Sequence, residues 1–335
     1  MTPNSDKLLR PQNLNAFVGQ EAIKTQLRTV IQAAKAQDKT TIGHVLLYGP
    51  AGTGKTSLAY IISNELGVPC WATTGTNLAV QLSDYGNLYS MGAAIEQHGV
   101  IFCDEIHRVA NLAQDTLLPF LEERKLAVKY RAPSSEWGKR KGDWITLNCT
   151  MKEFTFIGAS TRPGLLQQPF RERFKLELEL SYYDAESLFQ IASRSAQLLE
   201  LSISDAALHI IARRSKGVPR LTNRNLWYCR QYQIANGHHY IDTHEVQQIM
   251  RELSIDTLGL DESDRNLLSY LAELNGPAGA NTLCAYLSID RATLETMLEP
   301  PLLRSRLIVK TARGRTITPK ALEHLKNPFN NSDDL

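Results

Sequence analysis

Residues 44–67, HVLLYGPAGTGKTSLAYIISNELG, decide the fold of this chain. Val45 to Tyr48 form a short apolar run that is typical of a buried strand, and a glycine-rich turn follows it. Thr56 to Leu66 then have the pattern of a helix that ends at Gly67. A strand, a phosphate-sized loop and a helix in this order begin a parallel α/β unit. We therefore expect an α/β fold whose ligand lies beyond the end of the first strand.

The turn in this segment fits the phosphate-binding pattern G-x-x-x-x-G-K-[ST]. Its glycines let the backbone N–H groups point at phosphates, and the helix N-terminus adds partial positive charge. Lys55 is expected to reach the β- and γ-phosphates of ATP, and the Thr56 hydroxyl to bind Mg²⁺. A glycine-rich turn without a ligand is the alternative, which the flanking strand and helix disfavour. The residues assigned to the nucleotide here are Gly49, Gly52, Thr53, Gly54, Lys55, Thr56 and Ser57.

Two further apolar runs complete the expected sheet. Val100 to Cys103 lead into Asp104 and Glu105, and Phe154 to Ser160 follow later in the chain. Strands separated by helices predict a doubly wound parallel sheet with its ligand at the carboxyl ends of the strands. Alone, an Asp-Glu pair after a strand is more often a solvated edge. Beside a phosphate loop, Asp104 becomes the candidate magnesium-side acid and Glu105 the candidate base that activates water.

The remaining patterns predict a hairpin and two smaller domains. Residues 126–148 alternate as a β-hairpin, with Lys139, Arg140 and Lys141 at its tip. Helical patterns then run to Leu253, and three helices followed by a two-stranded ribbon indicate a winged helix. The expected boundaries are 1–181 for an ATPase domain, 182–256 for a helical lid, 257–326 for the winged helix and 327–335 for a flexible tail.

Composition excludes several classes of protein. The five cysteines are scattered without a C-x-x-C pair, which argues against both a disulfide framework and a zinc ribbon. No apolar run approaches the roughly 18 residues that cross a bilayer, and the N-terminus lacks the apolar core of a signal peptide. We therefore expect a cytoplasmic protein that uses no membrane. The net charge of +2 is too small to indicate nucleic acid by itself.

Several motifs resemble the RuvB family, the bacterial AAA+ motors of Holliday-junction branch migration. The similarity is collinear from about Leu9 to Leu325. Its motifs are Leu9 to Pro11, Phe17 to Gln20, His44 to Pro50, Asp104 to Arg108, Gly158 to Leu166, Pro169 to Phe174, Gly217 to Arg224 and Thr311 to Arg315. The resemblance implies a hexameric ring that hydrolyses ATP to ADP and draws duplex arms of four-way junction DNA through it in recombination and repair.

The resemblance also implies roles for single residues. Ser160 or Thr161 senses the γ-phosphate, and Arg173 is the arginine finger that serves the ATP of a neighbouring subunit. Arg220 is a second sensor. An arginine donated in trans makes hydrolysis depend on assembly; read alone, Arg173 is a surface charge beside a loop. The residues implied to bind the rest of the nucleotide are Leu9, Arg10, Phe17, Val18, Tyr183 and Pro219.

DNA contacts are expected in the basic wing near the end of the sequence, and partner contacts at the hairpin of residues 126–148. Residues 304–320 contain six cations and no acidic residue, which is typical of either a phosphate-contacting wing or a solvated face. The resemblance favours DNA contacts by Arg304, Arg306, Lys310, Arg313 and Arg315. It also implies docking of the hairpin on a RuvA-like junction-binding protein and association with a RuvC-like resolvase. Residues 131–143 are longer and more basic than the usual hairpin, so this segment fits an altered partner or touches DNA directly.

Two other functions compete with a translocating motor. A clamp-loader-like AAA+ switch would assemble a protein on DNA, but such subunits often carry a four-cysteine zinc module and a collar without a winged helix. A scaffold that no longer hydrolyses ATP is the second alternative. The intact set of Lys55, Thr56, Asp104, Glu105 and Arg173 disfavours it.

Overall fold

The computed structural model describes residues 8–78, 95–96, 98–131 and 144–329, with the two hairpin strands described by their backbone. The chain forms two compact units. One spans Arg10–Ser181; the other runs from Tyr182 onward and includes the N-terminal segment up to Leu9. Across the described residues, no helix is both long and apolar enough to span a membrane.

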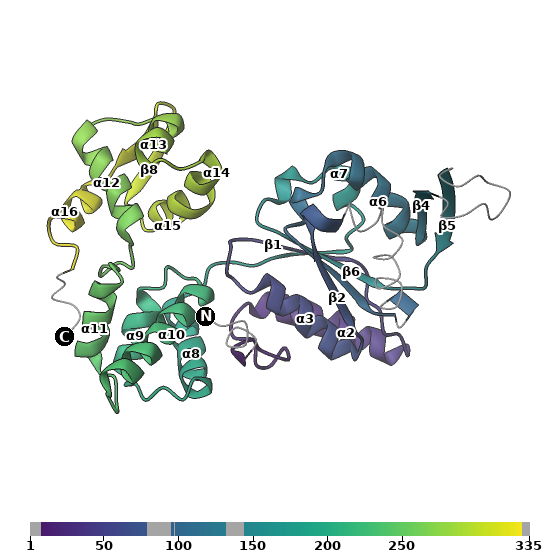
Figure 1. Cartoon of the computed structure of the whole chain (residues 1–335), viewed down its shortest axis with the longest axis horizontal. Helices are drawn as coiled ribbons and strands as arrows, with labels where there is room; N and C mark the ends of the chain where they lie inside the picture. The colour runs from purple at the N-terminus through teal and green to yellow at the C-terminus, as the bar shows by residue number, and fades with distance from the viewer. Residues whose placement is uncertain (1–7, 79–94, 97, 132–143, 330–335) are drawn as a thin grey trace. The chain divides into compact units, whose positions relative to one another are not determined.

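The first unit is built on a five-stranded sheet whose paired strands all run parallel, in the order β2-β3-β6-β1-β7 (Figure 1). The strands are β1 Val45–Tyr48, β2 Cys70–Thr74, β3 Val100–Asp104, β6 Thr155–Ser160 and β7 Leu176–Glu179. The predicted doubly wound α/β sheet is thus confirmed. Edge strands β2 and β7 were not predicted, because both are partly exposed and interrupt their apolar residues with polar ones.

Side chains of the central strands alternate between two apolar cores, as the pleat of a strand requires. In β1, Val45 and Leu47 enter one core while Leu46 enters the other. The first core is completed by α2 and α3, and the second by α6 and α7, so helices cover both faces (Figure 1). These helices are α2 Glu21–Ala36, α3 Lys55–Leu66, α6 Asn111–Glu123 and α7 Gln168–Arg171.

The strand order determines where the functional residues meet. β6 lies between β1 and β3, so the carboxyl ends of these three strands are adjacent. The phosphate loop follows β1, Asp104 ends β3 and Ser160 ends β6. Residues far apart in sequence therefore converge at one edge, where doubly wound sheets bind ligands.

A separate antiparallel hairpin lies between β3 and β6 in the chain. Its strands, β4 Lys125–Arg131 and β5 Trp144–Thr150, pair with Lys125 opposite Thr150 and Arg131 opposite Trp144. The strands extend slightly beyond the predicted 126–148 range. The expected basic tip, Lys139 to Lys141, lies outside the described residues.

The second unit begins with a helical lid around its own apolar core. Asp184, Ser204 and Asp242 cap three of its helices by accepting hydrogen bonds from first-turn N–H groups, which explains where these helices begin. The lid helices are α8 Ala185–Leu198, α9 Asp205–Arg213, α10 Pro219–Asn236 and α11 Thr243–Glu252.

A winged helix with a fourth core follows. β8 and β9 pair antiparallel, with Lys310 opposite Arg315. Helix α16 was not predicted; the Thr318 side chain caps it and Pro319 occupies its first turn. The elements are α12 Glu262–Leu274, α13 Ala280–Leu287, α14 Arg291–Thr293, a π-helical turn Leu294–Leu298, α15 Glu299–Arg304, β8 Ile308–Thr311, β9 Gly314–Ile317 and α16 Pro319–Lys326.

The first residues of the predicted tail contact the winged helix. Both the N–H and the hydroxyl of Thr257 donate to the carbonyl oxygen of Pro328, each over 3.1 Å. The guanidinium of Arg265 lies 4.9 Å from the ring centroid of Phe329. These two tail residues are therefore fixed against the winged helix, while residues 330–335 lie outside the described part of the chain.

Candidate nucleotide site and DNA-binding surface

The phosphate loop depends on glycine for its shape. Gly49, Gly52 and Gly54 have φ values of 135°, 78° and 108°, in the left-handed region that side chains disfavour. A Cβ atom on Gly49 would lie 2.1 Å from the carbonyl oxygen of Leu180, at the end of the neighbouring strand β7. This glycine therefore provides both the turn and the close approach of two backbones.

Lys55 lies inside the loop that it belongs to. Its ammonium donates to the carbonyl oxygens of Gly49 and Pro50, each over 2.8 Å, and the residue is buried. The hydroxyl of Thr53 also donates to the Pro50 oxygen over 2.8 Å. The curled loop thus surrounds a positive charge, which is the arrangement that triphosphate binding needs.

Thr56 and Asp104 form the oxygen pair expected for magnesium. The hydroxyl of Thr56, in the first turn of α3, donates to Oδ2 of Asp104 over 3.2 Å. Oδ1 of Asp104 accepts from the N–H of Glu105 over 2.9 Å, which fixes the carboxylate plane. Mg²⁺ is usually held by one or two carboxylates together with substrate phosphates, and this donor set fits that chemistry.

Glu105 lies at a strained position beside this pair. Its φ is 48°, a left-handed value that is uncommon outside glycine and often found at functional sites. Its Oε2 accepts a hydrogen bond from the Thr161 hydroxyl over 3.2 Å. A Cβ on Gly75 would lie 2.4 Å from the Glu105 carbonyl oxygen, so a glycine there leaves room for this backbone.

His107 is a site residue for which the sequence predicted no role. Its Nδ1 lies 3.2 Å from Oε2 of Glu105 and 3.2 Å from Oγ of Ser160. Burial lowers the pKa of the imidazole, Glu105 opposes this shift, and the cations Arg108, Arg162 and Lys55 add to it. A histidine two residues beyond the candidate base was the available signal.

The two sensor candidates occupy different environments. Ser160 is fully buried, and its Oγ accepts from the N–H of Arg162 over 2.9 Å while lying beside His107. Thr161 is partly exposed and contacts Glu105 directly. The serine thus supports the histidine, and the threonine faces the base.

Arg173 lies just after α7. One guanidinium nitrogen is 2.9 Å from Oε2 of Glu122 in α6, and the side chain is 30% exposed. Its Nε is buried and has no hydrogen-bond partner among the described residues. Within the described residues, the arginine therefore keeps donor capacity beyond its pair with Glu122.

The residues predicted to bind the base divide between the two units. In the first, the Gln20 amide bonds with Ser181, donating to its oxygen over 2.8 Å and accepting from its N–H over 3.2 Å. This pair ties the chain beside Phe17 and Val18 to the segment that follows β7. Phe17 is buried in the core, and the Arg10 guanidinium lies 4.7 Å from the Tyr60 ring centroid.

In the second unit, the remaining candidates lie around the start of α10. The N–H of Tyr183 donates to the Gly217 carbonyl over 2.9 Å. Pro219 begins the helix, and Arg220 follows it as an exposed side chain. Leu9 is buried, and its carbonyl accepts from Arg194 over 3.1 Å.

The basic segment 304–320 of the winged helix is partly neutralised by an acid from outside the segment. Glu299, buried in α15, lies 2.6 Å from Nε of Arg315 and 2.5 Å from the ammonium of Lys310. Two of the six predicted free cations therefore share an acid that lies earlier in the chain than the basic segment. Arg313, at the ribbon tip, and Arg306 are exposed.

Comparisons with known proteins agree in all three parts of the chain. Residues 9–180 match the family model "Holliday junction DNA helicase RuvB P-loop domain", residues 183–256 match "RuvB AAA lid domain" and residues 257–326 match "RuvB C-terminal winged helix domain". The Holliday junction branch migration complex subunit RuvB of Kosmotoga olearia is 38% identical over 322 residues, covering 95% of this chain and 90% of that protein.

Other relatives give similar values. The same subunit from Ligilactobacillus salivarius is 37% identical over 329 residues, covering 97% of this chain and 94% of the relative. The solved structure of the Thermotoga maritima RuvB Holliday junction branch migration motor is 36% identical. It has a TM-score of 0.81 and covers 97% of this chain and 99% of that one.

Proposed function

The chain belongs to the RuvB family, and from this membership we propose that it is an ATP-driven motor of Holliday-junction branch migration. The observation that carries the proposal is the meeting of Lys55, the Thr56–Asp104 pair and Glu105 at adjacent strand ends. These groups supply a phosphate cradle, a metal-side acid and a base. A winged helix in the same chain supplies a DNA-binding part, which a clamp-loader-like collar lacks.

Hydrolysis follows from the positions of these side chains. Lys55 neutralises phosphate charge, and Glu105 accepts a proton from the water whose oxygen attacks the γ-phosphorus. A new P–O bond to that water forms as the bond to the ADP oxygen breaks. A magnesium ion held by Thr56 and Asp104 would neutralise the β- and γ-phosphate oxygens. ATP is the substrate, and ADP and phosphate are the products.

We assign γ-phosphate sensing to Thr161 rather than Ser160. The Thr161 hydroxyl contacts Glu105 from the partly exposed side of the site, whereas Ser160 is fully buried behind it against His107. When ATP binds, the Thr161 hydroxyl would donate to a γ-phosphate oxygen instead of to Glu105. The Glu105 carboxylate would then be free to face the attacking water.

Arg173 supports a ring in which each site is completed by a neighbour. Its side chain is 30% exposed and pairs with Glu122, which is itself 56% exposed, so the guanidinium can exchange this partner for an acceptor on another copy. A guanidinium aimed at the γ-phosphate would stabilise charge spread over the transferring group. We propose that this acceptor is ATP bound to an adjacent copy in a hexamer, with lid residues Tyr183, Pro219 and Arg220 completing the binding of the nucleotide.

We assign DNA contacts to the winged helix and partner contacts to the β4–β5 hairpin. Arg313 and Arg306 are the exposed cations of the winged helix that we assign to phosphates of duplex and four-way junction DNA. The β4–β5 hairpin projects from the sheet unit and is the proposed docking element for a RuvA-like protein (Figure 1). A RuvC-like resolvase would act on the same junction.

The test is a junction-dissociation assay with synthetic four-way DNA. Purified protein with ATP and Mg²⁺ should separate the junction into duplexes, more efficiently when a RuvA-like protein is added. Lys55→Ala protein should remain inactive under both conditions, because it lacks the phosphate-binding ammonium. ATP hydrolysis without junction dissociation in either condition would contradict branch migration and favour a switch function.

A further inference from the structure

Lys216 lies where the lid meets the winged helix, three residues before Pro219. Lys216 and Gly217 both have left-handed backbones, with φ values of 52° and 74°, so the chain turns sharply before α10. The Lys216 ammonium leaves the lid and binds the winged helix. It is 2.9 Å from Oδ2 of Asp261 and also pairs with Asp264.

The two acids that Lys216 binds are the capping box of α12. Asp261 is the N-cap, and Asp264 occupies the third helical position, with each side chain accepting from the other's backbone N–H. The Lys216 side chain is 12% exposed and that of Asp264 is fully buried. Loss of either partner would leave the other charge buried without its counter-ion, which is strongly destabilising.

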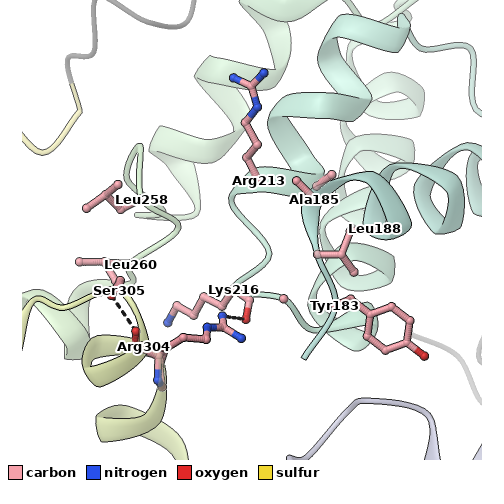
Figure 2. A pocket seen from close by; sticks show the side chains of 12 residues that line it. Tyr183, Ala185, Leu188, Arg213, Lys216, Leu258, Leu260, Arg304 and Ser305 are labelled. Atoms are coloured by element: carbon pink, nitrogen blue, oxygen red, sulfur yellow. Dashed lines mark hydrogen bonds between the residues drawn. The ribbon is translucent and has the colours of Figure 1, made fainter. Parts of the chain in front are cut away.

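Arg304 makes a second connection from the other side of the same turn. Its guanidinium donates to the backbone carbonyl of Lys216 (Figure 2). It also lies 3.9 Å from the Tyr182 ring centroid. A Cβ on Gly217 would lie 2.8 Å from Nη1 of Arg304, so the glycine admits the arginine. Arg304 thus contacts both chain segments that lead to the lid's nucleotide-binding candidates.

The packing around the contacts of Lys216 and Arg304 is incomplete. A cavity of ≈ 260 Å³ lies between the two parts, and Lys216, Gly217 and Arg304 are among its lining residues (Figure 2). Apolar groups of the lid, such as Leu188, and of the following part, such as Leu260, line it as well. Beside this cavity, the lid and the winged helix are therefore joined by the polar contacts of Lys216 and Arg304.

We infer that Lys216 and Arg304 are positioning residues that make the winged helix follow the lid loop carrying Arg220. This inference rests on the proposed motor function. When nucleotide moves that loop, Asp261 and Asp264 would draw α12 with it through Lys216, while Arg304 draws α15. Arg304 is thereby reassigned from the predicted DNA contacts to the coupling of ATP state and DNA movement.

Hydrogen exchange of the full chain, with and without ADP and Mg²⁺, tests the inference. In the parent, nucleotide should slow exchange of residues 214–220 and, by about fivefold or more, of α12 and α15. In Arg304→Gln, the slowing at 214–220 and of α12 should persist, because Lys216 still binds Asp261 and Asp264, while the slowing of α15 falls toward onefold. Arg304→Lys, which keeps a charge and a donor, should retain most of it.

The controls separate the inference from the function on which it rests. Arg251→Gln removes an exposed lid arginine and should behave as the parent. Parent-like slowing of α15 in Arg304→Gln would overturn the inference while leaving the nucleotide site intact. Absence of any slowing at 214–220 in the parent would overturn both.

DNA binding provides a second, independent measurement. The salt dependence of duplex binding should keep its slope in Arg304→Gln, whereas Arg313→Gln should lower it by about one phosphate contact. An equal loss of slope in both variants would make Arg304 a DNA contact and overturn its coupling role.

Discussion

The hydroxyl of Thr161 donates a hydrogen bond to Oε2 of Glu105 over 3.2 Å, joining the residues that follow strands β6 and β3. His107 approaches the same carboxylate oxygen from within the next turn. The candidate base is therefore held by neighbours on two sides, and its orientation depends on groups that the phosphate-binding motif does not contain.

Glu105→Gln should bind ATP as tightly as the parent and lose turnover by about 10²–10⁴-fold, because an amide cannot accept the proton of water. Nucleotide affinity and steady-state hydrolysis measure the two effects. Glu153→Gln, an exposed change outside the strand ends, is the matched control. Equal rates in Glu105→Gln and the parent would rule out this base.

Gly49→Ala should destabilise the first unit by about 2 kcal/mol or more and abolish nucleotide binding. The new methyl would meet the Leu180 carbonyl at 2.1 Å on a backbone with φ of 135°. Denaturant unfolding and ATP titration measure both losses. Gly164→Ala meets no atom within 4 Å and should be neutral, so equal stability of the two variants would contradict this account.

Arg173→Ala and Glu105→Gln proteins should each be inactive alone and recover part of the ATPase activity when mixed. Recovery is expected because a mixed interface can combine an intact arginine from one copy with an intact base from the other. Titrating one protein against the other measures it. An ATPase rate that stays at baseline at every ratio would contradict action between subunits.

Arg313→Ala and Arg315→Ala should have different effects although both remove a wing cation. Arg313 is exposed, so its loss should weaken DNA binding with less than about 0.5 kcal/mol change in stability. Arg315 pairs with buried Glu299, so its loss should cost about 2 kcal/mol or more of folding free energy. DNA titration and thermal unfolding measure these effects, and identical unfolding of both variants would contradict the pairing.

Asp264→Asn should flatten the pH dependence of stability between about pH 4 and 6. Burial, together with Asp261 nearby, raises the pKa of Asp264 from 3.8 to about 6, while Lys216 opposes this. A raised folded-state pKa means that the stabilising contribution is present at low pH and is lost as pH rises through 6, by roughly 3 kcal/mol at most. Unfolding midpoints at pH 4.5 and 7 measure it; parallel curves for parent and variant would contradict it.

Sequence patterns predicted the parts of the fold that local chemistry determines. The phosphate loop, β3 with Asp104 and Glu105, and the helices and two-stranded ribbon of the winged helix follow from glycine placement and apolar periodicity. The edge strands β2 and β7 were missed because their partly exposed faces weaken that periodicity. Helix α16 is short and buries Ala321, so its pattern carries little apolar signal.

Contacts between distant segments could not be predicted in this way. The charges of residues 304–320 alone did not reveal Glu299, because this acid lies earlier in the chain, in α15. It contacts Arg315 of the wing only in the folded structure. His107 gained its place in the site from strand order, which brings β3 beside β6. Arg304 looked like one of several wing cations, yet its acceptor is a lid carbonyl 88 residues away in sequence.

The group that accepts the hydrogen bond of Arg304 is the backbone carbonyl of residue 216 and not its side chain. Every amino acid at position 216 presents a carbonyl, so relatives can exchange the lysine and still offer Arg304 its hydrogen bond. Position 217 is more restricted, because its φ of 74° disfavours any residue with a side chain and a Cβ there would lie 3.0 Å from the Tyr183 carbonyl oxygen. We expect Gly217 and Arg304 to be retained, and a lineage that replaces Lys216 to have replaced Asp261 and Asp264 as well, because these acids would otherwise lose their cation.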